Sequence, residues 1–191
     1  MVAVTKCGAI ATPVNWRLTA SEVRTVVDDA ECVLMVAGEE FQPTAAEAGH
    51  PAMTFSQLPR KAGGEDPHRD SENDVAWQLY TSGTTGLPKG AMLTNLNLVG
   101  LVTSLVVEIP EMRQGGRGLV AMPLYHIGGS GWANAVMANG SCMVFTREVV
   151  PQELLQVIAE QRVETAFLVP AVLLFMTQLP ESQTADFSSL R

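Results

Sequence analysis

Charge is scarce in this sequence, and its balance excludes some classes of protein. Charged residues make up 17% of the 191 residues and hydrophobic residues 47%, a composition typical of a folded globular chain and not of a disordered one. The formal net charge is −8, which argues against a broad surface for nucleic acid. Any site for an anionic ligand must therefore be built from a few local groups.

Cysteine pairs and long apolar runs are also missing. Cys7, Cys32 and Cys142 lie far apart without a CxxC pair, so we expect buried thiols in a reducing compartment and no zinc site or disulfide. No apolar run approaches the roughly 20 residues of a membrane span. Met1 leads almost at once into Lys6 without the basic region of a signal peptide. These absences favour a cytoplasmic protein.

The first 38 residues predict a strand–helix–strand unit. Residues 8–15 and 32–37 are short apolar runs, which are typical of buried strands. Between them, Thr19 and Glu22 have the S/T-x-x-E spacing of a capping box, which satisfies free amide groups at the start of a helix. One face of that helix then carries the apolar residues Val23, Val26, Val27 and Ala30.

Regular patterns disappear between residues 39 and 74. The second half of this stretch is polar and contains glycine and proline, so we predict an irregular connecting segment. His50 and His68 are expected to be solvated loop residues. The acidic residues near them are expected to be solvated as well, and we predict no metal site.

Residues 75–191 predict an α/β lobe with a glycine-rich loop near its start. A strand over 75–83 runs into the loop, and a second strand over 90–94 leaves it toward a helix. The strands expected after Gly118 cover 118–127, 141–146 and 165–170, and the helices between and after them cover 128–140, 151–162 and 170–179. This alternation favours mostly parallel sheets with helices on both faces.

The stretch from residue 80 to residue 94 reads YTSGTTGLPKGAMLT and has the chemistry of a phosphate-binding loop. Glycines let backbone amides approach a phosphate chain, hydroxyl side chains donate to its oxygens, and a lysine offsets its charge. The pattern is neither the Walker loop G-x-x-x-x-G-K-[ST] nor G-x-G-x-x-G, so kinase-like P-loop chemistry and dinucleotide binding are disfavoured. Composition alone leaves a flexible hairpin between two strands as an equal alternative.

The same stretch closely resembles the phosphate-binding signature of the adenylate-forming (ANL) superfamily, which includes acyl-CoA synthetases, luciferases and the adenylation domains of peptide synthetases. The resemblance extends through GAIATPVNWRLTASEV (8–23), TNLNL (94–98), MPLYHIGG (122–129) and VPAVLLFMTQLP (169–180). The histidine after PLY resembles the fatty-acid–CoA ligase branch and argues against an amino-acid adenylation module. The resemblance implies that residues 1–191 are a partial N-terminal AMP-binding domain of an acyl-CoA synthetase.

This resemblance implies a two-step reaction that uses ATP, a carboxylic acid and coenzyme A. The carboxylate attacks the α-phosphorus of ATP to give an acyl-adenylate and pyrophosphate, and the thiol of coenzyme A then displaces AMP. The loop is expected to hold the β- and γ-phosphates and to stabilise the charge on pyrophosphate, with Pro88 setting the turn. Mg²⁺ is implied too, although no metal ligand is assigned in this sequence. The phosphate-binding residues implied are Thr81, Ser82, Gly83, Thr84, Thr85, Gly86 and Lys89.

The acyl pocket is implied to lie around His126, which would line it near the reacting carboxylate and gate it. Gly128 and Gly129 would leave room for the acyl tail, and Trp132 would line or block that room. From the residues alone, a core histidine that closes a strand is the favoured interpretation. Ordinary helix packing would likewise explain the small residues and Trp132.

Several parts of the family's pattern have no counterpart in the sequence. They are a Y-G-x-T-E segment with a magnesium-binding glutamate, a T-G-D segment for the ribose, and the small C-terminal domain with its lysine. We therefore expect an internal piece of the large N-terminal domain that forms no acyl-adenylate alone. A non-catalytic remnant is the alternative. The partners expected are a chain that carries the missing segments, or a second copy joined through exposed apolar surface.

Overall fold

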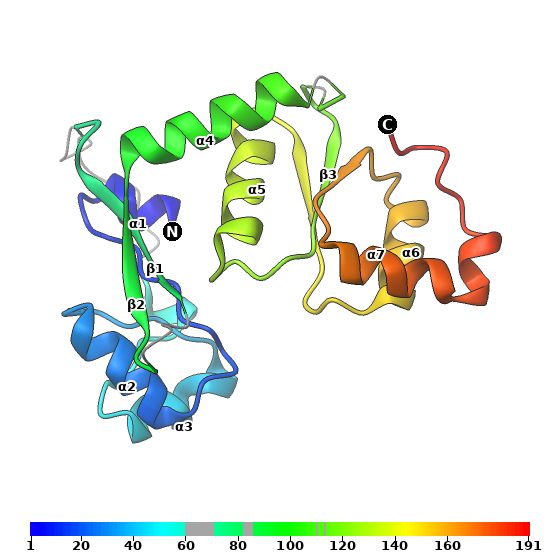
Figure 1. Ribbon diagram of the computed structural model, residues 1–191. Coiled ribbons are helices and arrows are strands. Elements are labelled where there is room, and N and C mark those ends of the chain that lie inside the picture. Colours follow the sequence, from blue (N-terminus) through cyan, green and yellow to red (C-terminus); the bar gives the residue numbers. More distant parts are fainter. Residues whose placement is uncertain (60–70, 82–85, 110, 113) are drawn as a thin grey trace. The chain divides into compact units, whose positions relative to one another are not determined.

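The computed structural model describes residues 1–59, 71–81, 86–109, 111–112 and 114–191 (Figure 1). The chain divides into two compact units, Met1–Leu96 and Asn97–Arg191. The first contains α1 (Val2–Lys6), α2 (Ala20–Asp29), η1 (Glu39–Phe41), α3 (Gln42–Glu47), η2 (Phe55–Gln57), β1 (Val75–Thr81) and β2 (Lys89–Thr94). Helix α4 (Asn95–Glu108) begins where this unit ends. The second contains β3 (Arg117–Val120), α5 (Ile127–Ala138), β4 (Cys142–Phe145), α6 (Pro151–Glu160), β5 (Thr165–Ala166), α7 (Pro170–Gln178) and η3 (Pro180–Gln183).

The two strands that the sequence predicts on either side of the glycine-rich loop form as β1 and β2, and both belong to the first unit. The strands are antiparallel, and their register ends with Thr81 opposite Lys89. Side chains alternate between the two faces of a strand, so Trp77 and Leu79 lie on one face. Both are buried, and this burial holds the hairpin against the rest of the unit.

Helix α2 forms as the sequence predicts. The Thr19 hydroxyl accepts from the backbone N–H of Glu22 at 3.4 Å, and the Glu22 carboxylate accepts from the backbone N–H of Thr19 at 2.8 Å. This reciprocal pair is the predicted capping box. The predicted apolar face is confirmed as well, because Val23 and Val27 pack against Ala48, which follows α3.

Two strands expected in the first unit do not form, although both segments are fully described. Within 8–15 the backbone makes one bridge, from Ala11 to Trp77, and within 32–37 one bridge, from Val36 to Met53. A strand requires a continuous ladder of backbone hydrogen bonds, and a single bridge does not provide one. Val33 is 100% exposed, so an apolar run was here a misleading sign of a buried strand.

The stretch from residue 39 to residue 74 has more structure than the sequence predicts. Its first part contains α3 and the turns η1 and η2. His50 is not merely solvated, because its Nε2 lies 2.7 Å from Asp28 Oδ1. Residues 60–70, including His68 and part of the acidic run, lie outside the described residues.

The cysteines are free, as expected, but the prediction that they are buried was wrong. Cys7 and Cys142 are exposed and Cys32 is half-buried. Cys7 follows α1, a helix without a buried residue. Cys142 is the first residue of β4, an edge strand of its sheet.

The second unit is a parallel sheet with the strand order β4–β3–β5. Strand β3 pairs with β4 over its whole length and with β5 at Gly118 and Leu119. The strands and the helices between them follow one another in the predicted order (Figure 1). The predicted parallel α/β architecture is therefore confirmed.

Consecutive residues of β3 belong to two different cores. Leu119 is fully buried with residues of α6 and α7, including Leu154. Val120 points to the other face and packs against α5 through Trp132, with apolar residues of α4 beside it. Helices therefore cover both faces of the sheet, and the central strand is buried on both sides as expected for parallel sheets.

The strands of this sheet are shorter than the sequence predicts. The strand expected over 118–127 ends at Val120. A turn follows in which the carbonyl of Pro123 accepts from the backbone N–H of His126 at 3.1 Å. Pro123 has no N–H to donate to a strand ladder, so strand pairing stops before it although the apolar run continues.

The helices of the second unit begin and end close to the predicted positions. Pro151 and Pro170 are the first residues of α6 and α7, where proline loses no helical bond. Gly140 follows α5 with a φ of +69°, a conformation that favours glycine. Among the residues that the structure describes, no helix is long and apolar enough to cross a membrane.

Truncation of Leu154 tests the core between the sheet and α6. Because Leu154 is fully buried, Leu154→Ala should lower the free energy of unfolding by about 2–5 kcal/mol through lost burial and a residual cavity. Leu174→Ala is the matched control, since Leu174 is 57% exposed and should change stability by about 0.5 kcal/mol or less. Urea denaturation measures both, and equal losses would contradict this description of the core.

Candidate functional site

The end of the β1–β2 hairpin brings Thr81 and Lys89 opposite each other. Both residues are exposed, and the Thr81 hydroxyl donates to the Lys89 carbonyl at 3.5 Å. The two ends of the intervening loop are therefore held about 5 Å apart, the spacing of neighbouring strands. Ser82, Gly83, Thr84 and Thr85 lie outside the described residues, so their phosphate-binding role stays a prediction.

Gly86 has a backbone conformation that explains why glycine stands there. Its φ is +88°, and a Cβ added at this position would meet no atom within 4 Å. The turn therefore requires glycine for its left-handed conformation and not because a neighbour crowds it. Gly86 is exposed, and the role of its amide in phosphate binding stays a prediction.

Tyr80, which precedes Thr81, is joined to the last residue of α2. Its hydroxyl donates to Asp29 Oδ2 at 2.5 Å, and Gln78 Nε2 donates to the same hydroxyl at 3.2 Å. Partial burial and the nearby carboxylate raise the pKa of Tyr80 above its ordinary value, because both disfavour the phenolate. The sequence gives no sign of this contact, since its partners are 51 residues apart.

Gly90 makes room for this arrangement. It pairs with Tyr80 across the hairpin, and an added Cβ would collide with the amide of Gln78 and lie 3.0 Å from Tyr80 Cζ. The absence of a side chain therefore lets Gln78 and Tyr80 fold over β2. The glycine that follows the predicted phosphate-binding lysine thus has a packing role of its own.

His126 lies after the carboxyl end of β3, in the turn that leads into α5. It is the N-cap residue of α5, and its Nδ1 accepts from the backbone N–H of Gly128 at 3.1 Å. His126 is exposed, so the alternative of a core histidine is wrong. Ligands of open α/β sheets bind outside the carboxyl ends of the strands, which is where His126 lies.

The glycines after His126 have different neighbours. A Cβ added to Gly129 would collide with the carbonyl oxygens of Met122 and Pro123, so close backbone packing requires this glycine. A Cβ added to Gly128 would lie 3.2 Å from a ring carbon of Phe167. Phe167 follows β5 and is 39% exposed. It forms an apolar wall beside Gly128, which no local pattern in the sequence indicates.

Trp132 is part of the core. It is 4% exposed, and its indole N–H donates to the carbonyl of Leu119 at 2.8 Å. The bond fixes α5 to the central strand, so helix packing accounts for this tryptophan. Its ring centroid lies 6.2 Å from that of Phe167. Through that contact it also supports the ring beside Gly128, while its place in an acyl pocket stays a prediction.

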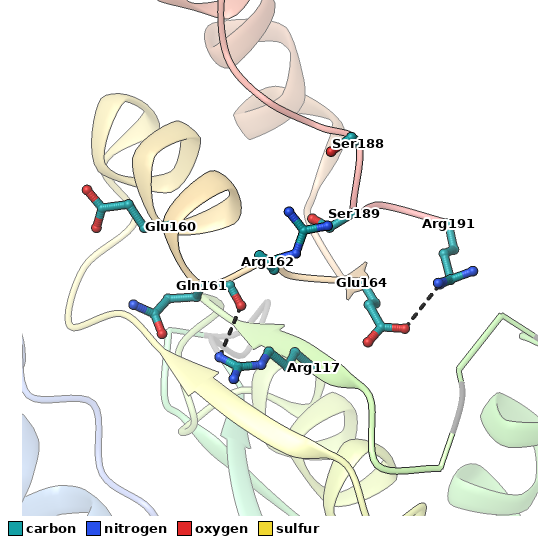
Figure 2. Close-up of a pocket in the computed structure, with 8 residues that line it drawn as sticks. All are labelled: Arg117, Glu160, Gln161, Arg162, Glu164, Ser188, Ser189 and Arg191. Atoms are coloured by element: carbon teal, nitrogen blue, oxygen red, sulfur yellow. Dashed lines mark hydrogen bonds and ion pairs between the residues drawn. The ribbon is translucent and has the colours of Figure 1, made fainter.

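A polar cavity of about 370 Å³ lies at the opposite end of the sheet (Figure 2). Arg117 is the first residue of β3 and donates to the carbonyl of Gln161 at 3.2 Å, while Arg191 Nε lies 3.1 Å from Glu164 Oε2. Arginines suit anions, but glutamates offset part of their charge here and the strands begin at this end. The lining residues are Arg117, Glu160, Gln161, Arg162, Glu164, Ser188, Ser189 and Arg191.

Comparison with known proteins decides the family. A family model described as AMP-binding enzyme matches residues 1–191. The chain belongs to this family. Fatty acid–[acyl-carrier-protein] ligase ScoC from Streptomyces coeruleorubidus is 34% identical, over 97% of this chain and 38% of that protein. Long-chain-fatty-acid–CoA ligase FadD13 from Mycobacterium tuberculosis is 28% identical, over 97% of this chain and 39% of that protein.

Solved structures confirm the fold of this AMP-binding family member. The inhibitor-bound N-terminal domain of FACL13 from Mycobacterium tuberculosis matches with a TM-score of 0.87 and 26% identity, over 98% of this chain and 50% of that chain. The resemblance inferred from the sequence is thereby confirmed, and the chain aligns with part of the N-terminal domain of FACL13. Because the chain spans 38% of ScoC and 39% of FadD13, the activity of a whole enzyme is a proposal.

The hydrogen bond between Tyr80 and Asp29 predicts that the Tyr80 phenol ionises at a higher pH than an ordinary tyrosine. The chain has two tyrosines, so Tyr125→Phe leaves Tyr80 as the only phenol. Its phenolate absorbance in the folded protein should rise at a pH well above 10, the ordinary value. A raised folded-state pKa stabilises the fold fully below pH 10, and this contribution is lost as the pH rises through the folded-state pKa.

Adding Asp29→Ala to Tyr125→Phe should move this titration down toward pH 10, because the carboxylate no longer disfavours the phenolate. Partial burial of Tyr80 would remain, so the shift should be incomplete. A native-state midpoint at pH 10 in the chain that keeps Asp29 would contradict the contact.

Proposed function

We propose that this chain is the phosphate-binding part of an adenylate-forming ligase that joins a fatty or other carboxylic acid to coenzyme A. The observation that carries the proposal is the hairpin end, where Thr81 and Lys89 flank the S-G-T-T-G loop in a member of the AMP-binding family. Relatives named as fatty-acid ligases support an acid of this class. They do not favour a non-catalytic remnant or an amino-acid adenylation module.

On the ATP side, the loop would hold the β- and γ-phosphates while the carboxylate attacks the α-phosphorus. Loop hydroxyls and glycine amides would donate to phosphate oxygens, and Lys89 would offset the charge on the departing pyrophosphate. Lys89 is the first residue of a paired strand, so its backbone is fixed while its long side chain stays mobile. Mg²⁺ would neutralise further phosphate charge, with no ligand assigned in this sequence.

On the acid side, we propose the exposed surface at the carboxyl ends of β3 and β5. His126 would lie near the reacting carboxylate, and Gly128 would leave space for the acyl chain beside it. Phe167 would form an apolar wall of that space, supported from behind by Trp132. Gly129 would contribute to the same proposed pocket indirectly, because it permits the tight turn that carries His126.

The thiol acceptor has a second candidate. The resemblance to fatty-acid–CoA ligases favours coenzyme A, but one relative with 34% identity is named as a ligase that acts on acyl-carrier protein. Both reactions would pass through the same acyl-adenylate and differ in the second step alone. A thioester assay with each acceptor would distinguish them, once the chain is part of an active enzyme.

The remaining partners and the location follow from the same proposal. We propose a partner chain that supplies the magnesium-binding, ribose-binding and C-terminal segments, and a cytoplasmic location. Exposed apolar residues in each unit, Val33 and Leu34 in the first and Leu174 and Phe175 in the second, would support self-association in the absence of such a partner. We propose no nucleic-acid partner, in keeping with the negative charge.

Lys89→Ala tests the phosphate site. Removal of one mobile, exposed charge should weaken ATP binding about fivefold in calorimetry at low ionic strength, equivalent to about 1 kcal/mol. Lys6→Ala is the matched control, because it changes the net charge equally at an exposed position in α1. If Lys89→Ala binds ATP as well as the unaltered chain does, the assignment of Lys89 is wrong.

His126→Ala tests the acid site. The variant should be made in a chimera in which this chain replaces the matching region of FadD13 from Mycobacterium tuberculosis. The KM for the fatty acid should rise about fivefold or more, while the KM for ATP changes by less than about twofold. A strong rise in the KM for ATP with an unchanged KM for the acid would contradict the proposed pocket.

A further inference from the structure

Helix α2 ends with two aspartates, a placement that helix electrostatics disfavours. The free carbonyls at the carboxyl end of a helix carry partial negative charge, which repels an acidic side chain there. Asp28 and Asp29 nevertheless occupy the last two positions of α2. Residues that break a local rule of this kind are expected where they serve some other need.

Each aspartate has a partner from a distant part of the chain. Asp28 Oδ1 lies 2.7 Å from Nε2 of His50, shortly after α3. Asp29 Oδ2 accepts from the hydroxyl of Tyr80, near the end of β1. The two aspartates at the end of α2 thus contact two different segments of the chain. Of the two, Asp29 is the one that contacts the β1–β2 hairpin.

The geometry of the hairpin makes the contact of Asp29 effective. Gln78 and Tyr80 lie on the same face of β1, and Gly90 pairs with Tyr80 on that face. Because Gly90 has no side chain, Tyr80 and Gln78 occupy the space above it. The hydroxyl accepts from Gln78 and donates to Asp29, so its single proton is directed to the carboxylate.

We propose that Asp29 is a positioning residue that acts through Tyr80 on the end of the hairpin, where Thr81 and Lys89 would hold the triphosphate of a nucleotide. This inference rests on the proposed function. Tyr80 directly precedes Thr81, and its partner Gly90 directly follows Lys89. One hydrogen bond therefore restrains the strand positions adjacent to both ends of the loop.

This restraint matters because the hairpin end is exposed. Thr81 and Lys89 have little burial to hold them, so other contacts must hold these two strand ends in place if they are to bind phosphate. A binding site that is ordered before its ligand arrives loses less conformational entropy on binding. Loss of the Tyr80–Asp29 bond should therefore weaken ligand binding even though neither residue touches the ligand.

The first test measures the binding of tripolyphosphate to the 191-residue chain by calorimetry. Tyr80→Phe and Asp29→Ala should each weaken binding about fivefold, in line with the net worth of one hydrogen bond. Asp29→Asn keeps an acceptor oxygen and should stay within about twofold of the unaltered chain. Asp28→Ala is the matched control, since it removes the neighbouring contact to His50 and should leave affinity unchanged.

Hydrogen exchange of the backbone amides gives a second readout that needs no ligand. In Tyr80→Phe and Asp29→Ala, the amides of residues 79–81 and 89–91 should exchange about fivefold faster. In Asp28→Ala those amides should keep their rates, while the amides around residues 48–50 exchange faster. Asp29→Asn should resemble the unaltered chain.

The two readouts separate failure of this inference from failure of the proposed function. If the unaltered chain does not bind tripolyphosphate, the phosphate site is wrong, and exchange still decides whether Asp29 holds the hairpin. If Tyr80→Phe exchanges at the hairpin as the unaltered chain does, the positioning role is wrong. Equal weakening of binding by Asp28→Ala and Asp29→Ala would also overturn it, because a general effect on stability would then explain both.

Discussion

The register of the β1–β2 pair is the constraint on which the candidate phosphate site depends. Burial of Trp77 and Leu79 on one face fixes which residues of β1 point inward. A slip of one residue would turn every side chain to the opposite face. The same register sets Thr81 opposite Lys89 and Tyr80 opposite Gly90. The core of the first unit thereby determines where the two ends of the loop lie.

A comparable dependence holds in the second unit, where the central strand supports the turn that carries His126. Leu119 and Val120 are buried on opposite faces of β3, and the indole of Trp132 donates to the carbonyl of Leu119. Strand and helix are thus fixed on both sides of a short turn. The proposed acid surface and the arginine-lined cavity lie at opposite ends of this sheet, since Arg117 begins β3 and His126 follows its carboxyl end. Only the former is at the carboxyl ends of the strands, where ligands of such sheets bind.

The sequence predicted those elements whose signals are local. The capping box at Thr19 and Glu22, the prolines that begin α6 and α7, and the order of strands and helices after Gly118 are all confirmed. The strands expected at 8–15 and 32–37 failed because an apolar run does not reveal whether a pairing partner is present. Val33 shows the error most clearly, since its side chain is wholly exposed.

The candidate site was predictable in its residue types but not in its supporting contacts. Sequence motifs predicted the hairpin and the position of His126. No motif predicts the hydrogen bond from Tyr80 to Asp29, because the two residues are 51 positions apart. Phe167 was missed for the same reason, because it meets Gly128 only after two strands are paired side by side. Contacts of this kind depend on tertiary packing and leave no periodic pattern in the sequence.

The central claim is that the anion site of this chain lies at the end of the β1–β2 hairpin. A titration of the isotopically labelled chain with ATP, followed through its backbone amide NMR signals, tests that claim most directly. We expect the largest shifts at the hairpin end, on Thr81, Lys89 and their neighbours. Largest shifts around Arg117, Arg162 and Arg191 would place the anion in the arginine-lined cavity at the amino ends of the strands in the second unit, and would show that the hairpin end is not the anion site.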